Sequence, residues 1–386
     1  MIKKQPVFLI IFALLTTSLL AQNYERYKKL KDVTITSKKL GFDKNISITV
    51  PIEWQEGTAN RFPLIILFDK QNQRSYNYIL NTIDYLTSTE QMPSSVIISV
   101  ASEQRYRYIE TSYKISDANG RALENEKFLF EELIPLAEKE YKASAFRVLI
   151  GHSRYGYFTT ALFSSRINDL NAVISMSPFF IQKEVDLTDS IGKLNKRTYR
   201  SQKYYRFGIG NDFPEDFTKM DSVLNQNTHN AFLDMKGYRF KQAGHDVTPG
   251  LIISTALYEL FEEWSAIQSR YSSVKQADLS IKPSLDKAIA SHYGAPLNFS
   301  IGVLNGKGWH FYNEQQYEKA VEAWNILMDA YPNFSEGYLS IINAQSRLKK
   351  DFSATTVKFR RSLTASRLYT EEQKKVLEKE LQELIN

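Results

Sequence analysis

Ser153 stands in a glycine-bounded hexapeptide, GHSRYG at 151–156. The apolar run Val148–Ile150 precedes it and an amphipathic run over 157–165 follows it, so the pattern predicts a strand, a sharp turn and a helix. A serine at such a turn presents its hydroxyl at the carboxyl edge of an open α/β sheet, where ligands bind. The amide of Arg154, at the helix N-terminus, faces the same space. The segment therefore predicts a serine nucleophile with an oxyanion donor beside it.

A serine hydroxyl is a weak nucleophile and needs a base within hydrogen-bond reach. His245 lies in the loop QAGHD at 242–246, between a predicted strand over 237–240 and the last apolar helix of the sheet region, which is the position of a hydrolase base. His152 adjoins the serine and is expected to support the turn. The other histidines lie in a polar stretch or in the C-terminal part: His229, His292 and His310. We predict His245 as the base; the alternative is a surface loop histidine.

An acidic residue is expected to orient the imidazole, and it should lie between the serine and the histidine in chain order. The predicted strand over 204–209 is followed by an acidic loop, GNDFPED at 210–216. Asp212 is the first candidate because it lies closest to the strand end, and the alternates are Glu215 and Asp216. A solvated loop without a catalytic member, which would leave a serine–histidine dyad, stays open.

An oxyanion hole needs two donors aimed at the developing negative charge. Beside the amide of Arg154, the second is expected from the loop after the apolar run Leu64–Phe68, as the amide of Lys70 or Gln71. Two aromatic residues at the start of the helix after the serine, Tyr155 and Tyr157, are the candidates for contact with a substrate.

The elements that must position these residues follow a βαβ pattern. Five apolar runs without alternation are typical of strands buried on both faces: 64–68, 96–100, 148–150, 172–175 and 204–209. Helical periods lie between them over 76–86 and 124–141, and an alternating antiparallel pair precedes them over 32–53. The pattern predicts an α/β-hydrolase sheet, mostly parallel with antiparallel N-terminal strands, ending in an apolar helix over about 250–264.

The composition changes after this helix, where residues 265–282 are polar. We expect a hydrolase domain over 22–270, a linker and short helix over 271–300, and an all-helical segment over 301–386. Gly308, Trp324 and the 34-residue spacing between Ala320 and Ala354 are typical of a tetratricopeptide repeat, of which the second copy is degenerate. A segment of this length cannot form a hydrophobic core alone. We therefore expect it to pack on the first domain or on a protein partner.

The N-terminus predicts export. Lys3 and Lys4 precede an apolar run over 7–15, and small residues end at Ala21. This is a signal-peptide pattern, and a membrane span would need about 20 apolar residues. We expect residues 1–21 to be cleaved and the protein to be periplasmic or secreted, in contact with a membrane only during export; an uncleaved anchor is the alternative.

The composition of the 386 residues excludes several classes of function. Cysteine is absent, which rules out disulfides, thiol nucleophiles, cysteine-ligated zinc and iron–sulfur clusters. The net charge of +6 is spread along the chain, so no nucleic-acid partner is expected. Neither an HExxH motif nor a phosphate-binding glycine loop occurs, so we expect no metal and no cofactor.

Together these motifs resemble the Fes-type esterase family, the esterase D and enterochelin esterase-like branch of the α/β-hydrolases, over residues 30–264. The matching segments are Leu64–Asp69, Met92–Ile98 followed by Arg105, Phe130–Tyr141, Arg147–Gly156 and Ser175–Pro178. Similar proteins also append tetratricopeptide-like helices. The resemblance implies hydrolysis of a small-molecule carboxylic ester through an acyl-enzyme, carried by Ser153, His245 and Asp212.

The sequence departs from this family at the elbow. The family usually has glycine two residues after the serine, where this chain has Tyr155, with Gly156 next. Tyr155 either lines an acyl pocket or marks a catalytically impaired, hydrolase-like binding protein whose helical tail docks a partner. Both alternatives stay open at the level of sequence.

Overall fold

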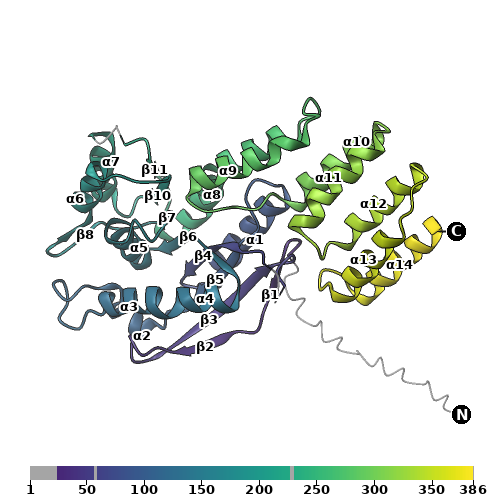
Figure 1. The fold of residues 1–386 in the computed structure, drawn as a ribbon. Coiled ribbons are helices and arrows are strands. Elements are labelled where there is room, and N and C mark those ends of the chain that lie inside the picture. Colours follow the sequence, from purple (N-terminus) through teal and green to yellow (C-terminus); the bar gives the residue numbers. More distant parts are fainter. Residues whose placement is uncertain (1–23, 56–58, 227–229, 386) are drawn as a thin grey trace, which may run out of the picture.

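The computed structural model describes residues 24–55, 59–226 and 230–385. Its centre is a nine-stranded sheet with the order β1-β3-β5-β4-β6-β7-β10-β11, in which β2 pairs with β3 outside this path (Figure 1). The strands of the sheet are β1 Tyr27–Lys29, β2 Val33–Thr36, β3 Asp43–Pro51, β4 Phe62–Phe68, β5 Val96–Val100, β6 Ala143–His152, β7 Ala172–Met176, β10 Lys203–Ile209 and β11 Leu233–Arg239. A separate small hairpin joins β8 Ile181–Gln182 and β9 Val185–Asp186.

The strand directions confirm the predicted fold class. From β5 to β11 all neighbours in the sheet run parallel, whereas β3 runs antiparallel to β5, β1 and β2. Within β4, Ile65 and Leu67 enter one apolar cluster, while Leu64, Ile66 and Phe68 enter the cluster on the other face. A strand buried on both faces explains why these runs show no polar alternation.

Helices cover both faces of the sheet. On one face lie α1 Gln73–Ser88 and the long α8 Thr248–Ser272. The other face is covered mainly by α3 Ala122–Phe128, α4 Ile134–Glu140 and α5 Arg154–Ser165. The remaining α-helices before α8 are α2 Gln104–Arg107, α6 Leu187–Gly192 and α7 Pro214–Gln226. Short helical turns lie at Ile109–Thr111, Lys193–Lys196 and His245–Val247, and after α8 at Leu279–Ile281.

The C-terminal region is helical, as predicted, but its first helices share the core of the sheet. It contains α9 Lys282–Tyr293, α10 Ile301–Asn313, α11 Tyr317–Ala330, α12 Ser335–Arg347, α13 Ser353–Ala365 and α14 Glu371–Ile385. α8 continues to Ser272, past the expected end at 264, and the apolar cluster beneath the sheet runs without a break from Trp264 to Trp324. α12–α14 have a small apolar cluster of their own. The boundary at residue 270 therefore falls inside a helix, and the domain limits stay a prediction.

Two glycines shape the helical region. Gly294 ends α9 with a φ of 73°, a left-handed conformation that favours glycine. Gly308 of α10 leaves no room for a side chain, because an added Cβ would lie 2.3 Å from the indole of Trp324 on α11. The repeat spacing that includes Gly308 and Trp324 thus corresponds to a close helix–helix contact, and the tetratricopeptide assignment itself stays a prediction.

The predicted signal segment, residues 1–21, lies outside the described residues. Among the residues that the structure does describe, no helix is both long and apolar enough to span a membrane.

Candidate active site

Ser153 occupies the turn between β6 and α5 with a φ of 57° and a ψ of −117°. A positive φ is uncommon for a residue with a side chain and persists only where the surroundings hold it. Here the Ser153 amide donates to the Met176 carbonyl of β7 at 2.8 Å, and the Ser153 carbonyl accepts from the Tyr157 amide at 2.9 Å. The strand, the sharp turn and the helix predicted around the serine are all present.

A side chain at Gly151 would collide with the backbone, and one at Gly156 would be tightly crowded. A Cβ on Gly151 would lie 2.3 Å from the Tyr155 carbonyl oxygen, and one on Gly156 would lie 3.2 Å from the Met176 carbonyl oxygen and from Pro178. The close approach of α5 to the strand beside it therefore falls at Gly156, one residue later than the family pattern places its glycine.

Tyr155 and Tyr157 point into the core, which contradicts their predicted contact with a substrate. Tyr155 is fully buried and stacks on Phe68, with ring centroids 4.4 Å apart. Its hydroxyl donates to Glu110 Oε1 at 2.5 Å, and Glu110 in turn accepts from the buried Lys44 ammonium at 2.9 Å. Tyr157 is equally buried, stacked on Phe179. Alternate residues of a helix face opposite sides, and here both faces of α5 are covered.

His245 and Asp212 meet across two loops at the carboxyl ends of the strands. His245 Nδ1 lies 2.6 Å from Asp212 Oδ2, with the carboxylate mostly buried and the imidazole half-buried. Partial burial, the largest single influence, raises the pKa of Asp212, but the hydrogen bonds with His245, the backbone and Ser177 together outweigh it and lower that pKa below its usual value. Asp212 is therefore ionised at neutral pH and can hold a proton on His245 Nδ1.

The two alternate acids lie elsewhere, in the first turn of α7. Asp216 accepts a hydrogen bond from the Phe180 amide at 2.6 Å, and burial raises its pKa. Glu215 is exposed on the same turn. The chain turns into α7 at Pro214, which carries both side chains away from His245, so that Asp212 is the acid that the structure brings to the imidazole.

Ser153 and His245 line one cavity of about 330 Å³. Its walls come from the loops after β4, β5 and β6 and from the turn at the start of α8. The lining is predominantly polar and consists of Asp69, Gln71, Asn72, Gln104, Arg107, His152, Ser153, His245 and Asp246. The cavity thus opens at the carboxyl edge of the parallel strands, where the elbow was expected.

Of the two predicted oxyanion donors after β4, the structure favours Gln71. The Lys70 amide donates to the Val100 carbonyl at 3.2 Å, and the Lys70 ammonium turns away to Asn45 and Ser47, so Lys70 is not available as a donor. Gln71 lines the cavity with Ser153. Arg154 is the first residue of α5, where backbone amides have no partner within the helix.

An ion pair that the sequence did not reveal holds these loops together. Arg107 binds Asp69 through two hydrogen bonds of 2.9 and 2.7 Å and also donates to the His152 carbonyl at 3.2 Å. Asp69 itself has a φ of 62°. Arg107 therefore joins the loop of Gln71 to the strand end before Ser153. The only sequence signal was that Asp69 ended an apolar strand.

His152 packs against His245. Its Nε2 lies 3.1 Å from the His245 carbonyl oxygen, and the two rings lie 4.6 Å apart. Burial, and then the neighbouring His245, lower the pKa of His152 to about 4. His152 is therefore neutral in the folded protein at neutral pH, and its role in supporting the turn stays a prediction.

This lowered pKa predicts a loss of stability in acid. The unfolded chain binds a proton at His152 below about pH 6.5 while the folded chain does so only near pH 4, so the contribution is complete above pH 6.5 and decreases below it. Between pH 7.5 and pH 5 we expect a loss of about 2 kcal/mol in the free energy of unfolding. Urea titrations of wild type and His152→Gln measure it. An equal loss in both proteins would assign the acid sensitivity to other groups.

Three possible metal ligands lie beside Ser153, because ligand atoms of His152, His245 and Asp246 lie within 4.8 Å of one another. His245 Nδ1 already faces Asp212, so a cation would occupy the second ring nitrogen of His245. A base needs this same nitrogen. Metal binding and base catalysis would therefore compete at this residue, and the expectation of a metal-free site stays a prediction.

The chain matches a family model described as "Putative esterase" over residues 37–239, just over half of its length. No curated protein sequence matches it. Among solved structures, an uncharacterised protein from Capnocytophaga ochracea is 10% identical with a TM-score of 0.60, covering 92% of this chain and 99% of its own. An IroE-like serine hydrolase from Shewanella oneidensis is 16% identical with a TM-score of 0.63, covering 78% and 99%. These likenesses show a shared fold, and the first extends over most of the helical region.

Proposed function

Because the chain belongs to the Putative esterase family and is thereby a carboxylic-ester hydrolase, we propose that Ser153, His245 and Asp212 perform the hydrolysis through an acyl-enzyme. The observation that carries this proposal is the 2.6 Å contact between His245 and Asp212 beside a cavity that also contains Ser153 in an elbow conformation. A nucleophile, a base and an orienting acid are the three roles that the chemistry requires.

In the proposed first half-reaction, Ser153 Oγ attacks the ester carbonyl and His245 accepts the hydroxyl proton. Asp212 stabilises the resulting imidazolium. The amides of Arg154 and Gln71 donate to the oxyanion of the tetrahedral intermediate. When the intermediate collapses, the bond to the alcohol breaks and His245 gives its proton to the leaving oxygen, which leaves Ser153 acylated.

In the second half-reaction, water takes the place of the alcohol. His245 accepts a proton from the water as its oxygen attacks the acyl carbon, and it returns that proton to Ser153 Oγ when the acid leaves. No cofactor takes part in this scheme, since every bond made or broken involves only substrate, water and the three side chains.

The polar walls of the cavity indicate the chemical class of the substrate. Gln71, Asn72, Gln104 and Asp246 surround the reaction centre. These side chains are exposed in the free protein, and polar groups around a reaction centre favour a ligand that forms hydrogen bonds with them over an apolar one. We therefore propose a small-molecule ester with hydroxyl, amide or carboxyl groups near the scissile bond. The signal-like N-terminus supports the further proposal that the enzyme acts in the periplasm or outside the cell.

The alternative of an impaired binding protein depended on Tyr155 obstructing the elbow. Tyr155 lies in the core beside Phe68 and Glu110, and Gly156 provides the close approach. The burial of Tyr155 supports the esterase proposal over this alternative. A partner for the helical region is a separate question.

Covalent labelling tests the proposed nucleophile directly. A fluorophosphonate probe should modify the folded protein at a single site, and digestion with mass spectrometry should place the adduct on Ser153, because the neighbouring base activates this hydroxyl alone. Protein unfolded in urea is the control and should not react. Labelling of another serine, or no labelling of folded protein, would contradict the proposal.

A further inference from the structure

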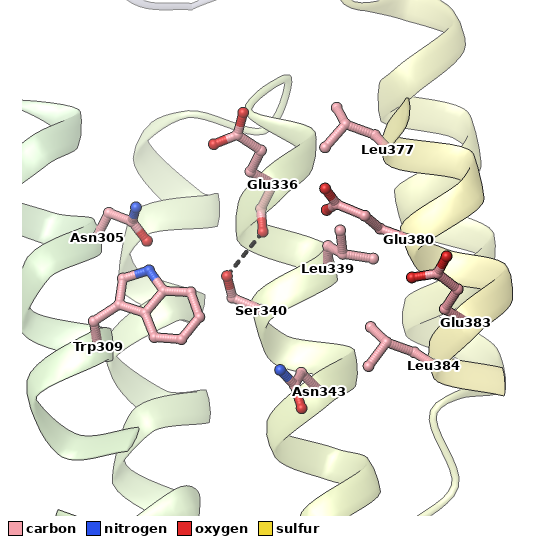
Figure 2. A pocket seen from close by; sticks show the side chains of 10 residues that line it. All are labelled: Asn305, Trp309, Glu336, Leu339, Ser340, Asn343, Leu377, Glu380, Glu383 and Leu384. Carbon is pink, nitrogen blue, oxygen red and sulfur yellow. Dashed lines mark hydrogen bonds between the residues drawn. The ribbon is translucent and has the colours of Figure 1, made fainter. Parts of the chain in front are cut away.

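The helical region contains a groove between its first, third and fifth helices after α9. α10, α12 and α14 enclose a volume of about 480 Å³, which we call the tail groove (Figure 2). Its lining combines apolar side chains, carboxylates and small polar groups: Trp309, Leu339, Leu377 and Leu384; Glu336, Glu380 and Glu383; Asn305, Ser340 and Asn343. Figure 1 shows α12–α14 well separated from α5 and the elbow, so the groove is distinct from the proposed active site.

The groove contains apolar surface that faces solvent. Trp309 is 38% exposed, whereas the other three tryptophans, Trp54, Trp264 and Trp324, are at most 4% exposed. Figure 2 shows the Trp309 indole extending from α10 toward the side chains of α12 and α14, with Leu339 and Leu377 beyond it. An exposed indole next to leucines is the kind of surface that binding partners cover.

The groove is also negatively charged within a protein whose net charge is +6. None of its ten lining residues is lysine or arginine. Within the described residues, Glu336 and Glu380 form no ion pair, and Glu383 has only a 3.7 Å contact with the exposed Lys379. Partial burial, and then the Glu380 carboxylate, raise the pKa of Glu336. Both carboxylates are exposed to solvent, and two carboxylates that repel each other across a groove would be stabilised by a cation placed between them.

Two carboxamides present hydrogen-bond donors in the same groove. Asn305 Oδ1 accepts from the Trp324 indole at 2.9 Å, and Asn343 Oδ1 accepts from the Tyr312 hydroxyl at 3.0 Å. These contacts fix both side chains with the oxygen engaged, so each Nδ2 amide remains as a donor. Amide donors at fixed positions suit the carbonyl groups of a peptide backbone, which a simple polyamine lacks.

We propose that the tail groove binds a basic peptide segment of a partner protein, in which lysine or arginine side chains alternate with aliphatic ones. The cationic groups pair with Glu336 and Glu380, the aliphatic side chains cover Trp309 and the leucines, and the carbonyls accept from Asn305 and Asn343. This inference goes beyond ester hydrolysis and does not depend on it.

Tryptophan fluorescence of the full-length protein tests the proposal, because Trp309 is the tryptophan that acrylamide can reach. The probe is a synthetic nonapeptide with alternating lysine and leucine, compared with a counterpart carrying glutamate in place of lysine. We expect the basic peptide to protect Trp309 from quenching and to bind at least about tenfold more tightly than the acidic one. Trp309→Phe should abolish the signal and thereby assign it.

Variants that remove the negative charges of the tail groove test where the basic peptide binds. Glu336→Gln combined with Glu380→Gln should weaken the binding of the basic peptide by about tenfold, since the neutral amides keep the shape of the side chains and remove their charge. Glu322→Gln on the outside of α11 is the matched control and should change nothing. Ester hydrolysis should be equal in all these variants, which separates this proposal from that of the active site.

The proposal would be overturned by equal affinity for the two peptides, by undiminished binding to the double variant, or by no protection of Trp309 at millimolar peptide. Spermine binding as tightly as the basic peptide would also overturn it, because the groove would then recognise charge without a peptide backbone.

Discussion

Replacing Ser153 with alanine is expected to lower kcat for p-nitrophenyl butyrate by about a millionfold. Without Oγ no acyl-enzyme forms, and His245 and Asp212 have no hydroxyl to activate. The residual rate would come from the amides of Arg154 and Gln71, which can still polarise a bound ester and admit water directly. Stopped-flow assays should also show the loss of the initial burst that an accumulating acyl-enzyme produces.

The fold must survive the substitution for this result to be interpretable. Ser153 holds a positive φ, and alanine tolerates that conformation no better than serine, so the free energy of unfolding should change by less than about 1 kcal/mol. Ser164→Ala, on the helix that follows Ser153 and outside the cavity, is the matched control and should keep full activity. A Ser153→Ala protein that retained a few per cent of wild-type turnover would place the nucleophile elsewhere.

The elbow could be predicted from sequence because its constraints are local. Gly151 and Gly156 are fixed by backbone contacts within five residues or with the adjacent strand, and the apolar runs on either side follow from burial on both faces of a parallel sheet. His245 and Asp212 also followed from local rules, since each lies just beyond a strand and such loops gather at one edge of the sheet.

Contacts between residues far apart in the sequence could not be predicted in the same way. Arg107 reaches Asp69 across 38 positions, and nothing in the local pattern distinguishes it from an exposed arginine. The direction of the Tyr155 ring depended on Glu110 and Lys44, which neighbour it only in the fold. The buried Glu110 carboxylate accepts the hydrogen bond of the tyrosine hydroxyl, and sequence periodicity carries no information about such a distant partner.

The way in which the helical region joins the sheet could not be predicted from the sequence either. Its polar stretch after Trp264 indicated a boundary, yet α8 continues to Ser272 and its buried side chains, with Tyr293 of α9, join the sheet to α10 and α11. The Tyr293 hydroxyl accepts from the Trp264 amide at 3.0 Å. Composition averages over both faces of a helix, so a polar average hides the apolar stripe that makes the two parts one core.

Replacing Asp212 with asparagine is expected to lower kcat by about ten-thousandfold. Hydrogen bonds, that with His245 foremost, lower the pKa of Asp212, so the carboxylate is charged throughout the neutral range and accepts a hydrogen bond from Nδ1–H of His245. An asparagine in the same place can turn its amide toward Nδ1 and donate instead. The imidazole then carries its proton on Nε2, where it cannot accept one from Ser153.

Two comparisons separate this effect from a general loss of structure. Asp216→Asn and Glu215→Gln neutralise the neighbouring acids of the same loop and should keep turnover within about threefold, because neither side chain reaches His245. Asp212→Ala leaves the imidazole free to exchange tautomers and should retain more activity than Asp212→Asn. If both Asp212 variants kept wild-type turnover, Ser153 and His245 would act as a dyad and the 2.6 Å contact would serve structure alone. If Asp216→Asn were instead the damaging change, the loop would have to rearrange when substrate binds.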